Sequence, residues 1–175
     1  MAGYEVFAGH LHSSGFIVKR RCRVQSIDVV GTSSAGLLEI WDTDVAPVAG
    51  TYGRSGTTVT VTKNGHGLSS GDTIGISFTP NTGVNATSGN YEITVTGDNT
   101  FTITDINTGT ISAGTACRYV SSNSNDIDSR WLTTYHTAAT DIFVNNLSVP
   151  GDGLLARKGV YVGATNLDSI NIFYA

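Results

Sequence analysis

Charged side chains are scarce in this sequence: Asp, Glu, Lys and Arg make up 14% of its 175 residues, against roughly 25% in an average globular protein. Gly, Thr, Ser and Asn supply the missing polarity. Thr favours strands, and Gly, Ser and Asn favour turns, whereas surface helices prefer Ala, Glu, Lys and Leu. The sequence therefore predicts an all-β protein with little helix.

The sequence also lacks long apolar runs and an excess of positive charge. No run approaches the ~20 residues of a membrane-spanning helix, and the residues after Met1 lack the basic start and apolar stretch of an export signal. The formal net charge is −4, which disfavours binding to nucleic acid. One short basic cluster, Lys19 to Arg23, indicates a solvated strand edge or, less favoured, a small surface for an acidic partner.

Cysteine is nearly absent as well. Cys22 and Cys117 are the only two, too few for a disulfide scaffold and without the spacing of metal ligands. The expectation is two buried free thiols. A disulfide stays open only if the two Cα atoms lie within about 7 Å of each other.

Motifs for catalysis and cofactor binding are missing too. The sequence has no Gly-x-Ser-x-Gly elbow and no phosphate-binding glycine loop. His10 and His12 are spaced i, i+2 and would share one face of a strand, yet zinc needs three or four ligands. Solvated histidines are therefore favoured over a metal site. No catalytic residue, cofactor or metal is expected.

The middle of the chain, residues 56–119, alternates between apolar residues and Thr, which is the pattern of half-buried strands. Turn-forming Gly, Asn, Asp and Ser separate these strands. The pattern predicts a small β-barrel module whose inner face carries Val59, Val61, Ile74, Ile76, Phe78, Tyr91, Ile93, Val95, Phe101 and Ile103.

The flanks, residues 1–55 and 120–175, show longer aliphatic strands. Residues 23–30 and 37–42 read as two neighbouring antiparallel strands, and further strands are expected at 141–144, 159–162 and 169–174. Neither flank has enough strands for a core, whereas both together supply about eight. We therefore predict a discontinuous, jelly-roll-like antiparallel β-sandwich that hosts the middle module, with Gly/Ser-rich seams at 50–56 and 121–125.

Aromatic side chains outside the module are candidates for contact with a partner. Trp41 and Tyr161 lie in strand-like segments and are expected to be packed. Residues 129–138 have Thr pairs and no helical periodicity, which predicts an irregular or extended stretch. Trp131, Tyr135 and His136 in that stretch are candidate interface residues.

The middle module resembles a small β module that recurs in virion proteins of tailed phages. The likeness rests on His66-Gly67-Leu68-Ser69-Ser70-Gly71-Asp72, followed by the strand at 91–95 and by Asn99-Thr100-Phe101-Thr102. It covers about 55 positions. The signature has a physical basis, because Gly67 and Gly71 permit tight turns while Asp72 and His66 can fix the loop through hydrogen bonds.

The flanks resemble short phage structural proteins in Trp41-Asp42, in Pro150-Gly151-Asp152-Gly153-Leu154 and in the Gly-Val-Tyr-Val strand that starts at Gly159. The segment containing Arg157 and Lys158 is longer and more basic than that pattern, so these two residues join the candidate interface.

These two resemblances imply a non-enzymatic capsid decoration (cement) protein on the outer surface of a virion. Its partners would be the major capsid protein and further copies of itself, plausibly as a trimer. The alternative is a tail-associated or surface adhesin that binds host glycan through Trp131, Tyr135 and His136.

Overall fold

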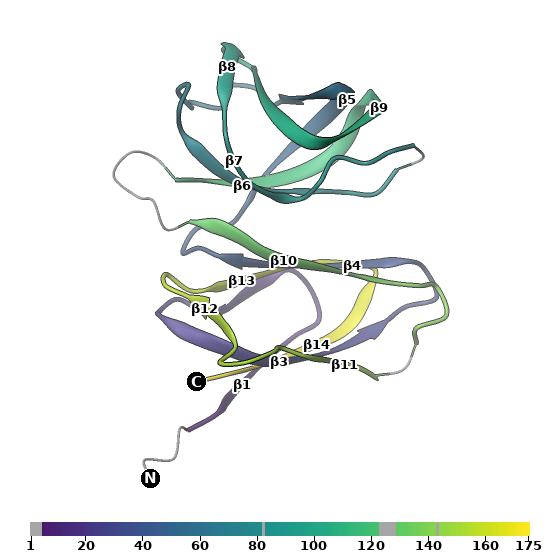
Figure 1. Ribbon diagram of the computed structural model, residues 1–175. Helices are drawn as coiled ribbons and strands as arrows, with labels where there is room; N and C mark the ends of the chain where they lie inside the picture. The colour runs from purple at the N-terminus through teal and green to yellow at the C-terminus, as the bar shows by residue number, and fades with distance from the viewer. Residues whose placement is uncertain (1–4, 82, 123–128, 143) are drawn as a thin grey trace. The chain divides into compact units, whose positions relative to one another are not determined.

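The computed structural model describes residues 5–81, 83–122, 129–142 and 144–175, and strands account for all the regular secondary structure of these residues (Figure 1). The predicted all-β class is confirmed. The chain divides into two compact units, here called the host unit (Met1–Ala46 and Leu132–Ala175) and the inserted unit (Pro47–Trp131).

The host unit consists of two antiparallel sheets. One has the order β1-β14-β3-β11, with β12 also paired to β3, and the other has the order β10-β4-β13-β2. The strands are β1 (Phe7–Leu11), β2 (Gly15–Val18), β3 (Cys22–Gly31), β4 (Gly36–Asp42), β10 (Arg130–Thr137), β11 (Val144–Ser148), β12 (Leu154–Ala156), β13 (Val160–Thr165) and β14 (Leu167–Tyr174).

Side chains from both sheets form one core, as in a β-sandwich. Val24 and Ile27 of β3 and Ile170 of β14 come from the first sheet, and Ile40 of β4 and Val162 of β13 come from the second. Strands from both ends of the chain are therefore needed for this core. Cys22 lies in it as a free buried thiol, and burial raises its pKa.

The prediction that residues 23–30 and 37–42 form neighbouring strands of one sheet is wrong. These residues lie in β3 and β4, which belong to different sheets. The reason is that β14 pairs with β3 along one edge while β11 and β12 share the other, so β3 has no free edge for β4. The connection after Gly31 crosses from one sheet to the other instead.

The inserted unit is one sheet with its own core. Its strands are β5 (Val48–Thr62), β6 (Thr73–Phe78), β7 (Gly89–Glu92), β8 (Thr94–Gly97) and β9 (Thr100–Ser122), in the order β5-β9-β6-β7 with β8 also paired to β9. Among the described residues no pairing joins β7 back to β5. Closure into a barrel thus stays a prediction.

The predicted inner face of this unit agrees closely with its core. Eight of the ten expected residues are buried, and Tyr91 and Val95 pack against the core while partly buried. Cys117, the second free thiol, is also in this core.

The boundaries of the unit differ from the expected 56–119. Residues 50–56, expected as a seam, lie within β5, and β9 runs past residue 119. The composition of 50–56 is misleading because the buried Tyr52 and Arg54 alternate with small Gly, Thr and Ser residues. Of the other expected seam, Ser121 and Ser122 belong to β9, and residues 123–125 lie outside the described residues, as does Phe143 of the strand expected at 141–144.

The signature loop after β5 has the structural roles expected from its sequence. Gly67 and Gly71 have positive φ angles of 65° and 93°. His66 Nδ1 accepts a hydrogen bond from the backbone N–H of Leu68 at 3.0 Å, and its Nε2 lies 2.9 Å from the carbonyl oxygen of Gly97. Asp72 accepts the N–H of Ser69 at 2.8 Å. His66 and Asp72 therefore fix the loop through hydrogen bonds.

Candidate functional site

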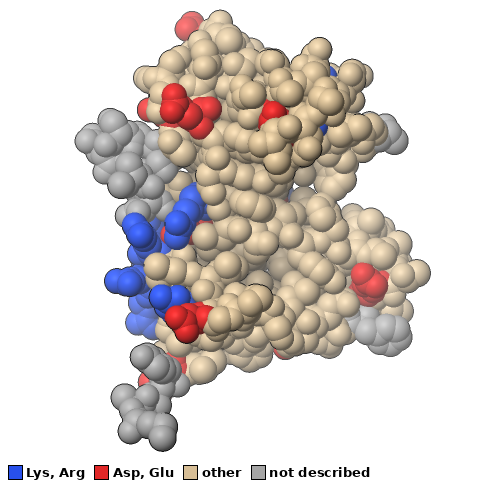
Figure 2. All heavy atoms as spheres, viewed as in Figure 1, with Lys and Arg blue, Asp and Glu red and all other residues tan. Residues whose placement is uncertain are grey.

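Two loops of the host unit carry half of the basic residues of the chain. The loop between β2 and β3 holds Lys19, Arg20 and Arg21, and the loop between β12 and β13 holds Arg157 and Lys158. Strand pairing makes the loops neighbours, because Ala156 is opposite Cys22 and Val160 is opposite Val18. With Arg23 of β3 these residues are six of the ten Lys and Arg of the chain, and we refer to them as the basic patch. Figure 2 shows Lys and Arg side chains gathered in one area of the surface.

A buried carboxylate holds the second of these loops. Asp42, at the end of β4, is 0% exposed. It accepts the backbone N–H of Arg157 at 2.9 Å from each oxygen and that of Lys158 at 2.9 Å, and the N–H of Gly159 lies 3.4 Å from it. Three consecutive amides directed at one carboxylate fix the loop backbone.

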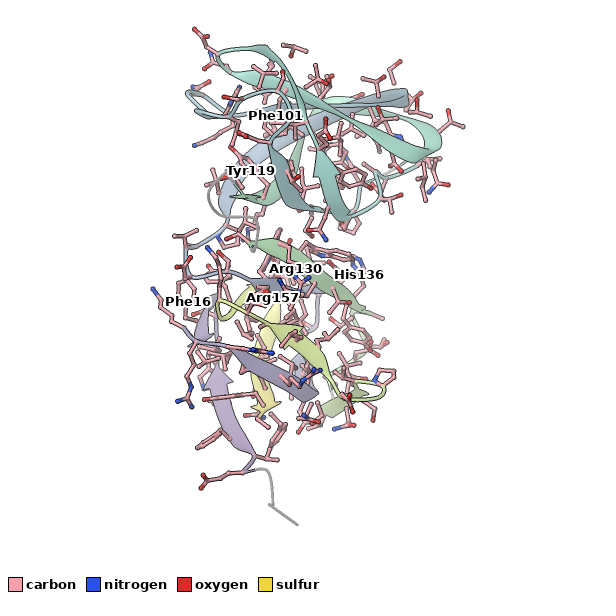
Figure 3. All side chains as sticks on the ribbon, turned by 60° about the vertical axis from the view of Figure 1, so that its left-hand side comes forward. Phe16, Phe101, Tyr119, Arg130, His136 and Arg157 are labelled. Carbon is pink, nitrogen blue, oxygen red and sulfur yellow. The ribbon has the colours of Figure 1, made fainter. Side chains whose placement is uncertain are left out.

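Close packing fixes the same loop from the other side. A Cβ atom on Gly159 would lie 2.4 Å from the carbonyl oxygen of Val18, which only glycine avoids. The backbone N–H of Thr43 donates to the carbonyl oxygen of Gly159 at 3.1 Å. Arg157 is exposed, so a rigid backbone presents its side chain to solvent (Figure 3).

Aromatic rings support the first loop. The Nζ atom of Lys19 lies 4.0 Å from the centre of the Phe16 ring, and Phe16 packs edge-on against Tyr161 with ring centres 4.9 Å apart. The guanidinium of Arg20 lies 5.7 Å from the centre of the Phe7 ring. Cation–π contacts of this kind orient a cation while leaving its outer side free for a partner.

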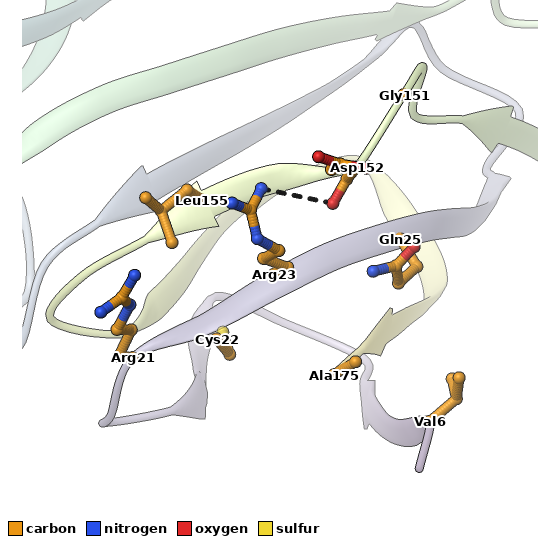
Figure 4. Close-up of a pocket in the computed structure, with 9 residues that line it drawn as sticks. All are labelled: Val6, Arg21, Cys22, Arg23, Gln25, Gly151, Asp152, Leu155 and Ala175. Carbon is orange, nitrogen blue, oxygen red and sulfur yellow. Dashed lines mark hydrogen bonds between the residues drawn. The ribbon is translucent and has the colours of Figure 1, made fainter. Parts of the chain in front are cut away.

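A carboxylate pairs with one residue of this patch. Lys158 Nζ is 3.7 Å from Asp44, whose side chain is 54% exposed. Arg23 donates to the backbone carbonyl oxygen of Asp152 at 3.4 Å, not to its carboxylate (Figure 4). A pocket of about 660 Å³ next to these residues is lined by Arg21, Arg23 and Asp152 among others. Positively charged residues of the basic patch therefore line part of this pocket.

The structure does not bring Trp131, Tyr135 and His136 together. All three lie in β10, but Tyr135 packs against the host core and the adjacent His136 is exposed on the other face (Figure 3). The backbone of Trp131 is bonded to Asn90, donating to its Oδ1 at 3.0 Å and accepting from its Nδ2 at 3.1 Å. The predicted extended conformation of this stretch is observed, whereas a common binding surface is not.

The sequence pattern does not indicate two buried charged groups of the inserted unit. Arg54 of β5 and Asp105 of β9 form an ion pair of 3.3 Å with both side chains fully buried. Arg54 also donates to the carbonyl oxygens of Gly56, Val84, Asn85 and Asn107, so all its N–H groups have partners. A buried Arg in an alternating strand looks like an outward residue, so only a knowledge of the β5–β9 pairing could have revealed the pair.

The environment of Asp105 favours its ionised form. Burial raises the pKa of this carboxyl group, but hydrogen bonds from the backbone N–H groups of Thr87 and Asn107, a contact with the Thr87 side chain and the charge of Arg54 outweigh burial, and the net pKa is lowered. The pair is a structural element of the inserted unit.

In the described part of the chain, no group of three or more His, Cys, Asp or Glu side chains could hold a metal ion. The same residues include no helix of the length and apolar character needed to cross a bilayer. Comparisons with protein-family models, with curated proteins and with solved structures gave no match.

Proposed function

We propose that this chain is a non-enzymatic virion structural protein, a decoration protein that binds the outer surface of a capsid shell through the basic patch. The observation that carries the proposal is the distribution of charge. A chain with a formal net charge of −4 places six of its ten basic residues on two adjacent loops of one unit and at the start of β3, which follows one of these loops. The resemblance of the inserted module and of the flanks to phage virion proteins supplies the kind of partner.

The construction of the patch suits adhesion to an acidic protein surface. Asp42 and the close packing at Gly159 fix the loop backbone before any partner binds, which lowers the entropy lost on association. Complementary charge speeds encounter and sets orientation. The major capsid protein would then supply carboxylates opposite Arg20, Arg21 and Arg157.

Binding to shells assembled without this chain tests the proposal. The triple variant R20E/R21E/R157E should lose at least tenfold in affinity in a co-sedimentation assay, because three attractive contacts become repulsive. K63E, which reverses a charge on the inserted unit, is the matched control and should bind as the original chain does. Equal binding by the triple variant and the original chain would contradict the proposal.

The alternative function, a glycan-binding adhesin, gains no support from the site. It required Trp131, Tyr135 and His136 on one surface, and Tyr135 and His136 face opposite sides of β10. The number of copies per particle separates the two functions, because decoration requires hundreds of copies and an adhesin a few to some tens.

A further inference from the structure

Two histidines meet on the exposed side of the first strand of the host unit. His10 lies in β1 and His12 directly follows it, and both are exposed. Their Nε2 atoms are 3.0 Å apart, and their ring centres are 4.5 Å apart with ring planes at 88°. The two rings are therefore nearly perpendicular, and both Nε2 atoms are within reach of one shared ion.

The other nitrogen of each ring faces an oxygen. His10 Nδ1 is 2.7 Å from Asn171 Oδ1, and His12 Nδ1 is 2.7 Å from the backbone carbonyl oxygen of Asp168. These oxygens only accept hydrogen bonds, so each Nδ1 carries the hydrogen. In a neutral ring the lone pair is then on Nε2. Two neutral rings would thus bring two lone pairs within 3.0 Å of each other, and either a shared proton or a bound metal ion relieves that repulsion.

We propose that His10 and His12 form a binding site for one divalent transition-metal ion, Cu²⁺ or Ni²⁺, held by the two Nε2 atoms. A hydrogen bond from Nδ1–H to a carbonyl oxygen is the usual outer support of a metal-bound histidine. With metal–nitrogen distances of roughly 2.1 Å, the separation of 3.0 Å corresponds to an angle of about 90° at the metal. That angle suits the tetragonal geometry of Cu²⁺ and Ni²⁺ better than the tetrahedral geometry of Zn²⁺.

Strand pairing holds the site in place. β1 pairs with β14 so that His10 is opposite Asn171, which sets the first ring against its amide partner. No third His, Cys, Asp or Glu completes the site within the described residues. Two protein ligands leave the other coordination positions to water, so the ion exchanges readily. The sequence spacing indicated a shared face, and the contacts of the two Nδ1 atoms add the orientation that makes both Nε2 atoms ligands.

Titration of the full chain with Cu²⁺, followed by calorimetry and electron paramagnetic resonance, tests this site. The original chain should bind one Cu²⁺ with nitrogen hyperfine structure from two imidazoles. H10Q and H12Q should each weaken binding at least tenfold and remove one nitrogen from the spectrum. H136Q replaces another exposed histidine of the host unit and is the matched control that should leave both readouts unchanged.

A further variant tests the orienting contact. N171L keeps both histidines but removes the acceptor of His10, and it should weaken Cu²⁺ binding roughly tenfold. Thermal unfolding without metal should show that all these variants keep their fold. The proposal fails if the H10Q/H12Q double variant binds Cu²⁺ as the original chain does, or if the original chain binds none.

Discussion

Arg54 and Asp105 show how one residue pair can organise an unusually polar β unit. A buried ion pair is stable only when its remaining polar atoms are satisfied, and here carbonyl oxygens around Arg54 and backbone amides at Asp105 complete the set. The pair links β5 to β9 and fixes the segment around Val84 and Asn85 against both. Its replacement should affect the whole inserted unit.

The lowered pKa of Asp105 predicts a dependence of stability on pH. Since the folded pKa lies below the unfolded value of about 3.9, the contribution of this group is complete above pH 4 and is lost as the pH falls through the folded pKa. D105N should be less stable by about 3–5 kcal/mol at pH 7. The difference from the original chain should shrink between pH 4 and pH 2 in urea unfolding.

A matched carboxylate provides the control for this titration. Asp98 is exposed in the turn between β8 and β9, so D98N should follow the pH profile of the original chain. A D105N difference that stays constant down to pH 2 would show that Asp105 does not titrate as described.

At single positions the sequence predicted the core well and the buried charges poorly. Val59, Val61 and Phe101 alternate with Thr, and alternation alone assigns them to the inner face. Arg54 and Asp42 are polar residues whose burial depends on partners far away in the chain. Local pattern has no information about such partners. The sequence therefore could not show that Asp42 fixes the loop that holds Arg157 and Lys158.

Among the elements, the loop between β12 and β13 depends on a residue outside it. D42A would leave the partly buried amides of Arg157 and Lys158 without their acceptor. We expect a loss of about 1–3 kcal/mol in the free energy of unfolding, together with weaker shell binding because Arg157 is no longer held. Chemical denaturation measures the first effect, and co-sedimentation measures the second.

Asp44 is the control for this loop, because it is 54% exposed and its carboxylate pairs with the side chain of Lys158. D44A should change stability by less than about 1 kcal/mol. If D42A and D44A proved equally mild, the carboxylate of Asp42 would not be what orders the loop.

Strand existence was easier to predict than strand partnership. The strands at 23–30 and 159–162 were expected close to where β3 and β13 lie. The pairing of β3 with β14, β11 and β12 was not, because it joins residues more than a hundred positions apart. Hydrophobic alternation fixes which face a residue occupies but leaves the neighbouring strand undetermined.

At the scale of the whole molecule, the two units should be separable at the observed boundaries. A chain in which a short Gly/Ser linker replaces residues 47–131 should keep both host sheets and unfold cooperatively, because the host core contains no residue of the inserted unit. Circular dichroism and urea unfolding would show this. A disordered product would contradict the division.

The boundaries expected from sequence alone give the contrasting variant. Deleting 56–119 cuts β5 and β9 and removes Tyr119, the partner of Val48. The remaining part of β5 would then expose Tyr52 and Arg54, which are buried in the intact chain. This variant should aggregate, whereas the deletion of 47–131 should not.

The discontinuity of the host unit has a consequence during synthesis. Strands β13 and β14, which lie inside the two host sheets, are synthesised after the other described strands. The inserted unit is continuous and is synthesised before them. The pairing of Val48 with Tyr119 brings the start and end of that unit together once it folds, which shortens the loop that the late strands must close. We therefore expect the inserted unit of a nascent chain to fold before the two segments of the host unit can pair.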